Sequence, residues 1–445
     1  MAFLKPCLTL GSYHTMRITI FAAGSRGDIQ PCVQLGQGLR AAGVAARLAV
    51  PRDFAAFVQA HGLEVYPLRG DVQQIMASPT GRALMERGTR HPLRTIAAMR
   101  TLLAPVAQQM AADALAACAD ADLLISLAVF APLAQTLSTL RQIPLMLVEP
   151  TPLLPTGAFP APGWPLQRNL GSVANRLTGV LMLQILWQWY RPFINHFRQQ
   201  YGLPPSSGAA FYRTLSAHPL LGAYSPNIIP RPADWPVGVH VTGAWLPQPP
   251  TDWQPPADLA AFLANGPPPV YIGFGSMGGQ RPEALATLAL EALARSGQRG
   301  IMLTGWGGLR PTTVPATVCV VADVPHSWLF PRMAAVVHHG GAGTTAEGVR
   351  AGVPSIMVPF NFDQPFWGER IRALGVGPTP LPQARLSVAN LAAALTQAVA
   401  DQSLRARAAA LGAIVRAEDG VGQAVAQILR YSSSGTIFGT SGVGS

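Results

Sequence analysis

The feature that most constrains the fold of this chain is an alternation of short β-rich runs with alanine- and leucine-rich stretches, which recurs in both halves of the sequence. This alternation is typical of parallel α/β units, in which a helix follows each strand. We therefore predict an α/β protein with two Rossmann-like domains that face a cleft. Strands are expected at residues 17–21, 47–50, 122–126 and 144–148, with a crossover helix at 130–140, and then at 270–274, 301–304, 318–321, 335–338 and 355–358.

Proline-rich sequence marks the boundary between the two halves. Prolines crowd residues 246–268 and disfavour regular structure there, so we expect a linker between a first domain at 16–245 and a second at 269–431. Residues 1–15 are expected to form an N-terminal extension, and the Gly/Ser-rich residues 432–445 a disordered tail. The last helix of the second domain is a candidate to pack back on the first. Ligands of open α/β sheets bind beyond the carboxyl ends of the strands, so the cleft is the expected site.

The composition favours a globular, cytoplasmic protein that binds neither a metal nor nucleic acid. Hydrophobic residues make up 49% of the 445 residues and charged residues 12%, which is enough for substantial cores. The four cysteines lie too far apart for a metal cluster or a disulfide framework. The net charge of +11 comes almost entirely from scattered arginines, without the runs typical of nucleic-acid binding. Peripheral contact with an anionic membrane surface remains an alternative, although no apolar run reaches the roughly 18 residues that span a bilayer.

The densest chemical signal is a histidine- and glycine-rich turn between an expected strand and a helix expected to begin near Thr344. The unpaired N–H groups and positive dipole end of such a helix form an anion site, and no lysine follows as in a Walker loop. His339 can donate to a phosphate oxygen and Glu347 can accept from ribose hydroxyls, although each residue also has a purely structural interpretation. The candidate residues are His339, Gly341, Ala342, Gly343, Thr344, Thr345 and Glu347.

Two further segments carry acidic residues after expected strands. Asp363 and Gln364 offer an acceptor-only carboxylate beside an amide, a pair suited to the hydroxyls of a sugar, and Asp363 can also cap a helix starting near Pro365. The turn at residues 22–31, AAGSRGDIQP, contains Gly27 and Asp28. Because a carboxylate would repel a phosphate, either this turn binds no phosphate or Asp28 has another task, such as capping a helix.

Residues 175–201 break the alternation with a long run of large apolar side chains interspersed with arginines. The simpler interpretation is a core-facing helix. The alternative is an acceptor-pocket or membrane-facing element, because tryptophan, tyrosine and arginine together suit a lipid interface. Trp187, Tyr190 and Phe193 are the candidate acceptor-binding residues.

The motifs of the second half, at residues 339–347, 352–354 and 363–364, resemble the donor signature of nucleotide-sugar glycosyltransferases, a family that includes plant secondary-product, antibiotic and sterol enzymes. The runs at 24–31, 274–277, 341–345 and 363–368 are most similar to the sterol glucosyltransferase branch. The likeness covers residues 16–430 and implies the GT-B fold, with the acceptor bound by the first domain and the donor by the second. It also implies a transfer that inverts the configuration at the anomeric carbon. It implies transfer of glucose from UDP-glucose to the hydroxyl of a hydrophobic acceptor such as a sterol or another lipid, with no other cofactor.

The resemblance also implies a role for each candidate. His339 and the backbone of residues 341–345 hold the diphosphate, Glu347 binds ribose, and Asp363 with Gln364 binds the sugar. Asp28 corresponds to the acidic residue that acts as general base in antibiotic and sterol relatives. A carboxylate is a weak base at its usual pKa of about 3.9, but an apolar acceptor pocket would raise that pKa. Ser276 and Gly27 complete the implied donor site.

Several alternatives remain at this point. Many plant relatives have a tryptophan that stacks on uracil where this chain has Asp323, so a dTDP donor such as dTDP-rhamnose competes with UDP. A polyketide, carotenoid or flavonoid acceptor competes with a lipid. Asp120 and Asp122 have the spelling of a metal-binding Asp-x-Asp motif, but they precede a strand and so lie opposite the cleft. A sugar-nucleotide epimerase and a non-catalytic sugar-nucleotide or lipid-binding protein are the other function classes.

Overall fold

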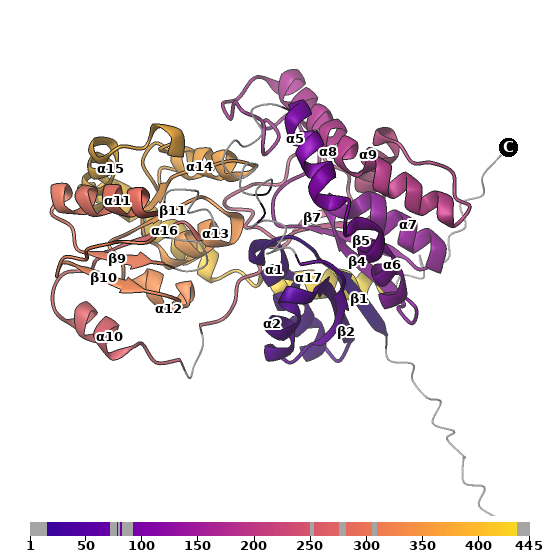
Figure 1. Ribbon diagram of the computed structural model, residues 1–445, viewed down its shortest axis with the longest axis horizontal. Coiled ribbons are helices and arrows are strands. Elements are labelled where there is room, and N and C mark those ends of the chain that lie inside the picture. The colour runs from indigo at the N-terminus through magenta and orange to yellow at the C-terminus, as the bar shows by residue number, and fades with distance from the viewer. Residues whose placement is uncertain are drawn as a thin grey trace, which may run out of the picture.

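The computed structural model describes residues 16–71, 78, 81, 92–249, 253–275, 282–304 and 309–433. Two α/β domains lie side by side, and each has a central sheet covered by helices (Figure 1). The predicted extension at 1–15, Ser276 and residues 434–445 of the predicted tail lie outside the described residues. The two-domain α/β architecture that the sequence predicts is confirmed.

The first domain contains a parallel seven-stranded sheet in the order β3-β2-β1-β4-β5-β6-β7. Alternate strand residues face opposite sides: Ile125 packs toward α1, α2 and α17, whereas Leu124 packs toward α6, α7 and α9. Both faces of the sheet are therefore buried, as in most parallel sheets. The strands are β1 (Arg17–Phe21), β2 (Ala45–Pro51), β3 (Glu64–Leu68), β4 (Leu123–Leu127), β5 (Leu145–Glu149), β6 (Leu220–Gly222) and β7 (Val239–Val241). The helices are α1 (Arg26–Ala41), α2 (Ala55–Ala60), α5 (Pro92–Leu103), α6 (Ala107–Ala117), α7 (Ala131–Arg141), α8 (Ser172–Gln200) and α9 (Gly208–Ala217).

The second domain contains a parallel five-stranded sheet in the order β10-β9-β8-β11-β12. Its apolar core again has one layer on each face, one with α11 and α15 and the other with α10 and α12. The strands are β8 (Val270–Gly273), β9 (Gly300–Leu303), β10 (Val318–Val321), β11 (Ala335–His338) and β12 (Ser355–Met357). The helices are α10 (Ala257–Ala264), α11 (Pro282–Ser296), α12 (His326–Leu329), α13 (Ala342–Ala351), α14 (Gln364–Ala373), α15 (Val388–Ala400) and α16 (Gln402–Arg416).

The order of the strands reverses once in each sheet. In the first sheet the reversal lies between β1 and β4, and in the second between β8 and β11. Helices leave to opposite faces at such a switch point and open a crevice beyond the carboxyl ends of the strands. β1 leads into the turn that carries Asp28, and β11 leads into the turn that carries His339. Both chemical signals of the sequence therefore lie at switch points.

The predicted linker is not free of regular structure, because it contains α10. Residues 257–264 have no proline, Pro256 precedes the first turn, and Asp258 lies near the positive end of the helix dipole. Leu259 is fully buried and fixes the helix to the second sheet. The prolines limit the length of this helix but do not prevent it.

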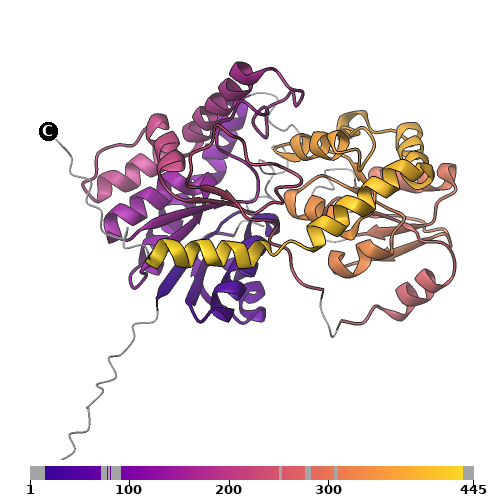
Figure 2. The same ribbon diagram turned by 180° about the vertical axis from the view of Figure 1, so that it is seen from behind.

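The chain returns to the first domain after α16. The last helix, α17 (Gly420–Ser433), packs against α1, and Figure 2 shows it in yellow, lying across the first domain. It extends two residues into the predicted tail. Where this return passes the linker, the backbones nearly touch: a Cβ on Gly243 would lie 2.8 Å from the Cα of Gly420. Nearby, Ser225 and Asn227 donate hydrogen bonds of 2.5 and 2.8 Å to the carboxylate of Glu418.

Candidate active site

The two switch points face each other across the domain interface. α1 and α13, which follow β1 and β11, are in contact. Burial lowers the pKa of His326 in the second domain, and the positive charge of Arg26 in the first turn of α1 lowers it further. Both helices therefore begin at the same cleft. A ligand there meets two helix N-termini from opposite domains, which is an environment suited to an anion.

The glycine turn of the second domain forms an open cradle. Gly341 is the N-cap of α13, and a Cβ there would lie 2.6 Å from Nε2 of His339. A Cβ on Gly275, at the end of the neighbouring strand β8, would contact the same imidazole at 3.5 Å. A Cβ on Gly343 would meet no heavy atom within 4 Å, so there is open space at the helix start. The turn thus has the shape that backbone binding of a phosphate needs.

Burial favours the neutral form of the His339 imidazole. Burial lowers its pKa to about 4, so at neutral pH one ring nitrogen carries a proton and can donate it to a phosphate oxygen. Nδ1 of His339 is buried and has no hydrogen-bond partner within the described part of the chain. Covering a neutral imidazole with a ligand costs less desolvation free energy than covering a cationic one, and most of the water around this ring is already excluded.

Other residues of the turn are structural. The hydroxyl of Thr345 donates to the Gly341 carbonyl at 2.9 Å and is fully buried, so only the backbone of Thr345 can serve a ligand. Nδ1 of His338 accepts from the Gly340 N–H at 3.2 Å and so fixes the turn. Thr344 and Ala342 stay half-buried at the cleft.

Glu347 is nearly buried and bound to a neighbour on its own helix. Its Oε2 accepts a 2.6 Å hydrogen bond from Arg350, whose other amino group donates to the Pro247 carbonyl in the linker at 2.9 Å. Burial raises the pKa of Glu347 to about 7, although the charge of Arg350 opposes the shift. A ribose hydroxyl would therefore bind the second carboxylate oxygen of Glu347, while Arg350 keeps the first.

Asp363 is held by a residue of the other domain. Thr151, in the loop after β5, donates a 2.8 Å hydrogen bond to Oδ2 of Asp363, and the indole Nε1 of Trp367 donates a second of 3.0 Å. Burial raises the pKa of Asp363 while these two bonds lower it. Asp363 is also the residue before α14, as expected, but its side chain does not cap the helix. The carboxylate is turned toward Thr151 of the first domain instead.

Gln364 uses one end of its side-chain amide within its own loop. Its Oε1 accepts from the backbone N–H groups of Phe360 and Asn361 at 2.8 and 3.2 Å, so the amide oxygen closes its own loop. The Nε2 amine is the part of the side chain that is left for a sugar hydroxyl. Phe362, which lies between Asn361 and Gln364 in this loop, has a positive φ of 54°. Bulky residues rarely adopt this conformation, and it often marks a functional turn.

Asp28 is the third residue of α1 and is not its N-cap, which is Ser25. The Ser25 backbone N–H and hydroxyl donate to Oδ2 of Asp28 at 2.7 and 2.9 Å. Burial raises the pKa of Asp28 to about 6, the bonds from Ser25 lower it, and the negative charge of Asp363 raises it further. The prediction that Asp28 is the helix N-cap is therefore wrong, because Ser25 holds that position. The carboxylate of Asp28 lies near enough to Asp363 of the opposite domain for the charge of Asp363 to affect its pKa.

The aromatic candidates of α8 divide into two kinds. Trp187 is 3% exposed and belongs to the apolar core of the first domain. Tyr190 packs against Phe130 with ring centroids 6.0 Å apart; burial raises the pKa of Tyr190, and the charge of Asp28 raises it further, so its hydroxyl lies near the carboxylate. Phe193 is half-buried. Tyr190 is therefore the aromatic side chain that the structure brings to Asp28.

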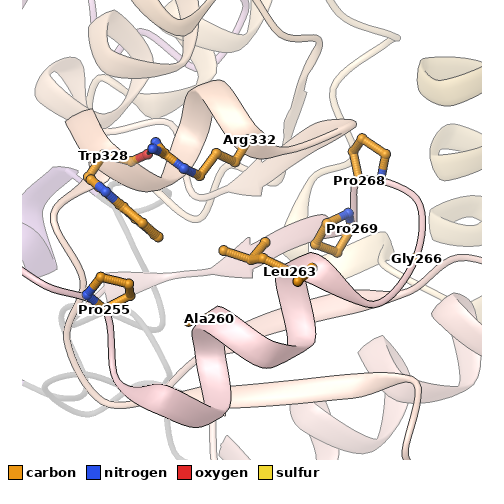
Figure 3. Close-up of a pocket in the computed structure, with 9 residues that line it drawn as sticks. Pro255, Ala260, Leu263, Gly266, Pro268, Pro269, Trp328 and Arg332 are labelled. Carbon is orange, nitrogen blue, oxygen red and sulfur yellow. The ribbon is translucent and has the colours of Figure 1, made fainter.

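The other sequence candidates lie away from this centre or outside the described residues. Asp120 pairs with Arg17 and Arg47 before β4, at the edge opposite the cleft. Within the described ranges, no group of three or more His, Cys, Asp or Glu is arranged to hold a metal ion. A surface pocket of about 490 Å³ lies between α10, the end of the linker and α12, where Trp328 and Arg332 line one side (Figure 3). It borders none of the predicted donor residues that the structure describes.

Sequence reasoning missed Thr151 and Glu149. Thr151 has no motif, and its contact with Asp363 spans 212 positions. Glu149 ends β5 and is 2% exposed; it accepts from Tyr224 at 2.9 Å and from the Leu153 N–H at 3.0 Å, and burial raises its pKa to about 8. A charged residue that ends an apolar strand was the available signal for Glu149, and none was available for Thr151.

The GT-B architecture of glycosyltransferases consists of two Rossmann-like domains whose switch points face each other. In this chain a helix N-terminus suited to an anion lies between them. Residues 18–132 match the Glycosyltransferase family 28 N-terminal domain, and residues 307–430 match the C-terminal domain of Erythromycin biosynthesis protein CIII-like proteins. The chain therefore belongs to the GT-B glycosyltransferases that include the sterol 3-beta-glucosyltransferases, and it is an enzyme of that family.

Individual relatives show how far the likeness extends. A sterol 3-beta-glucosyltransferase of Arabidopsis thaliana is 36% identical over 94% of this chain and 68% of that protein. The O-mycaminosyltylonolide 6-deoxyallosyltransferase of Streptomyces fradiae is 37% identical over 96% of this chain and 100% of that protein. The glycotransferase of kitacinnamycin, a solved structure, matches with a TM-score of 0.70 and 21% identity over 94% of this chain and 99% of that one, which shows the shared fold.

Proposed function

We propose that this glycosyltransferase moves a hexose, glucose from UDP-glucose, to the hydroxyl of a hydrophobic acceptor with inversion at the anomeric carbon. The observation that carries the proposal is the meeting of two carboxylates from opposite domains. Thr151 of the first domain donates a 2.8 Å hydrogen bond to Asp363 of the second, and α1, which carries Asp28, contacts α13, so the predicted sugar-binding residue and the predicted base lie at the same domain interface. Burial raises the pKa of Asp28, and the charge of Asp363 adds to that rise. The cradle beside His339 supplies the third component, an anion site on the donor side.

In the proposed reaction the acceptor oxygen attacks the anomeric carbon as its O–H proton passes to Asp28. The bond from that carbon to the diphosphate oxygen breaks, and the diphosphate leaves with the bonding electron pair. A base with a pKa of about 6 is ionised at neutral pH and is stronger than an ordinary aspartate. The N–H of His339 and the start of α13 would stabilise the charge that grows on the leaving group. Asp363 and the Gln364 amine would orient the sugar.

The choice of acceptor rests on the likeness to sterol enzymes and on the apolar surroundings of Asp28, where Tyr190 and Phe130 pack. A macrolide acceptor with a dTDP-deoxyhexose donor is the second candidate, because the Streptomyces relative is named for a tylonolide substrate and matches over its full length. Asp323 stands where many plant relatives have a tryptophan that stacks on uracil, so both UDP and dTDP donors are compatible with this position.

The test is a matrix of UDP-glucose, UDP-galactose and dTDP-rhamnose against sterols, lipids, macrolide aglycones and phenols, with products identified by mass and the anomeric configuration by NMR. Asp28→Asn should lower turnover by about 10²–10⁴ while UDP binding, measured by calorimetry, stays intact. Asp120→Asn is the matched control, because this exposed acid lies at the opposite edge of the same sheet. Near-wild-type turnover by a folded Asp28→Asn enzyme would remove Asp28 from the mechanism.

A further inference from the structure

The start of α8 exposes apolar side chains that the fold does not use. Among the described residues, ten large hydrophobic side chains are exposed, and five of them lie within residues 166–181. Val173 is 85% exposed, Leu177 54% and Leu181 41%. Positions four apart lie on one face of a helix, so these three form a single row. Single exposed apolar residues are ordinary, whereas a row of them marks a contact surface.

The sequence around this row is basic. Residues 150–233 contain no Asp or Glu and six arginines. Arg168 lies in the loop before the helix, together with Leu166, and Arg176 lies beside Leu177. Asp234, the first acid after this stretch, accepts hydrogen bonds from Thr156 and Gly157 and forms a 3.5 Å ion pair with Arg176, whose side chain stays 50% exposed. We call Leu166, Arg168, Val173, Arg176, Leu177 and Leu181 the α8 patch.

The position of the α8 patch differs from the one that the sequence suggests. The tryptophans and tyrosine in the second half of α8 are buried or directed toward Asp28, so they cannot form an outward-facing surface. The leucines and valine of the first turns lie on an exposed face of the helix, whereas Asn175, Thr178 and Gly179 of the same turns are buried on another face. In Figure 1, α8 lies on the side of the first domain away from α2 and α17.

We infer that the α8 patch docks the enzyme on an anionic lipid surface. A row of leucine and valine can enter the boundary between headgroups and acyl chains, while the flanking arginines meet the negative phosphates. The contact is peripheral: within the described ranges, no helix is long and apolar enough to cross a membrane. Residues 150–233 contribute no acid that would be repelled by such a surface, and the charge of Asp234 is offset by its ion pair with Arg176.

Vesicle sedimentation of the full chain, without donor or acceptor, tests this inference separately from the proposed function. The protein should bind vesicles of phosphatidylglycerol and phosphatidylcholine at low salt, and binding should fall steeply with salt or with phosphatidylcholine alone. Val173→Ser with Leu177→Ser should weaken binding by at least about tenfold, because two apolar side chains leave the interface. Arg168→Gln with Arg176→Gln should weaken binding to anionic vesicles only.

Val237→Ser is the matched control, because Val237 is 90% exposed in the turn before β7 and outside the α8 patch. Circular dichroism verifies that each variant is folded. Equal binding by the wild type, the apolar double variant and the control would overturn the inference, as would a lack of binding by the wild type. A wild-type dimer that the apolar double variant converts to a monomer in light scattering would also overturn it, because the occupant of the patch would then be a second copy of the chain.

Discussion

Removing the hydroxyl of Ser25 tests whether Asp28 is the group that ionises in the reaction. Two hydrogen bonds from Ser25 lower the pKa of Asp28, which burial and Asp363 hold at about 6. In Ser25→Ala the 2.9 Å hydroxyl bond is lost and the 2.7 Å backbone bond remains. A hydrogen bond to a charged group contributes about 1.5–3 kcal/mol, and 1.36 kcal/mol equals one pKa unit. Because the Ser25–Asp28 pair is half-exposed, we use the lower end of this energy range, about 1.5 kcal/mol. Loss of the hydroxyl bond should therefore raise the pKa of Asp28 by about one unit.

The assay is the dependence of kcat/KM on pH between about 5 and about 9. Because the base acts when ionised, the wild-type rate should fall about tenfold per pH unit below an inflection near 6. In Ser25→Ala the inflection should lie near 7, so activity is lost at pH values where the wild type keeps it. Glu347 and Glu149 also have raised pKa values, of about 7 and about 8, but neither has a hydrogen bond to Ser25.

The matched control is Ser207→Ala, which removes another serine N-cap. The Ser207 hydroxyl accepts from the Ala210 N–H at 3.1 Å at the start of α9. Both variants should lose about 1 kcal/mol of unfolding free energy, but Ser207→Ala should leave the pH profile unchanged. If Ser25→Ala also left the inflection in place, the ionisation would belong to a group other than Asp28, and the base assignment would fail.

Two further predictions address the cradle and the buried acid. Gly343→Ala places a methyl group in open space at the start of α13, so the unfolding free energy should stay constant or rise by up to about 1 kcal/mol, while UDP affinity in calorimetry falls at least about tenfold. Unchanged UDP affinity would show that the diphosphate does not bind at the start of α13. Glu149 has a folded pKa of about 8 against an ordinary 4.5, so its stabilising contribution is complete below 4.5 and is lost as pH rises toward 8. Denaturation across this range should show the wild type losing up to about 1.4 kcal/mol per pH unit and Glu149→Gln losing less; parallel slopes would contradict the assignment.

The sequence predicted the strands that form long apolar runs and missed those that do not. β1, β10 and β11 have the predicted limits, because buried parallel strands are continuous apolar runs. β3 contains Pro67 and begins with the exposed Glu64, which is compatible with its place at the sheet edge but removes the pattern of a strand. β6 and β7 have three residues each, too few to carry any periodicity. Only the pairing of β6 with β5, and of β7 with β6, makes them strands.

The candidate site divides in the same way. Turn chemistry and residue type identified His339, Asp28 and Asp363, because each follows a strand at its carboxyl end. The sequence could not show that the Gln364 oxygen is used by its own loop, since that depends on the positive φ of Phe362. Nor could it show Thr151 on Asp363, because a contact between two domains depends on how they meet.

The return of α17 to the first domain affects how enzymes of this kind can be recombined. Val421 and Val425 of α17 lie against Gly38 of α1, where an added Cβ would meet them at 2.4 and 3.2 Å, and Ile428 is fully buried in the same cluster. A hybrid enzyme joined only at the linker would combine the α1 of one parent with the α17 of another. A hybrid with a second junction between α16 and α17 keeps this contact within one parent. The unit that can be exchanged is therefore discontinuous in sequence, and the transferable donor module ends at α16.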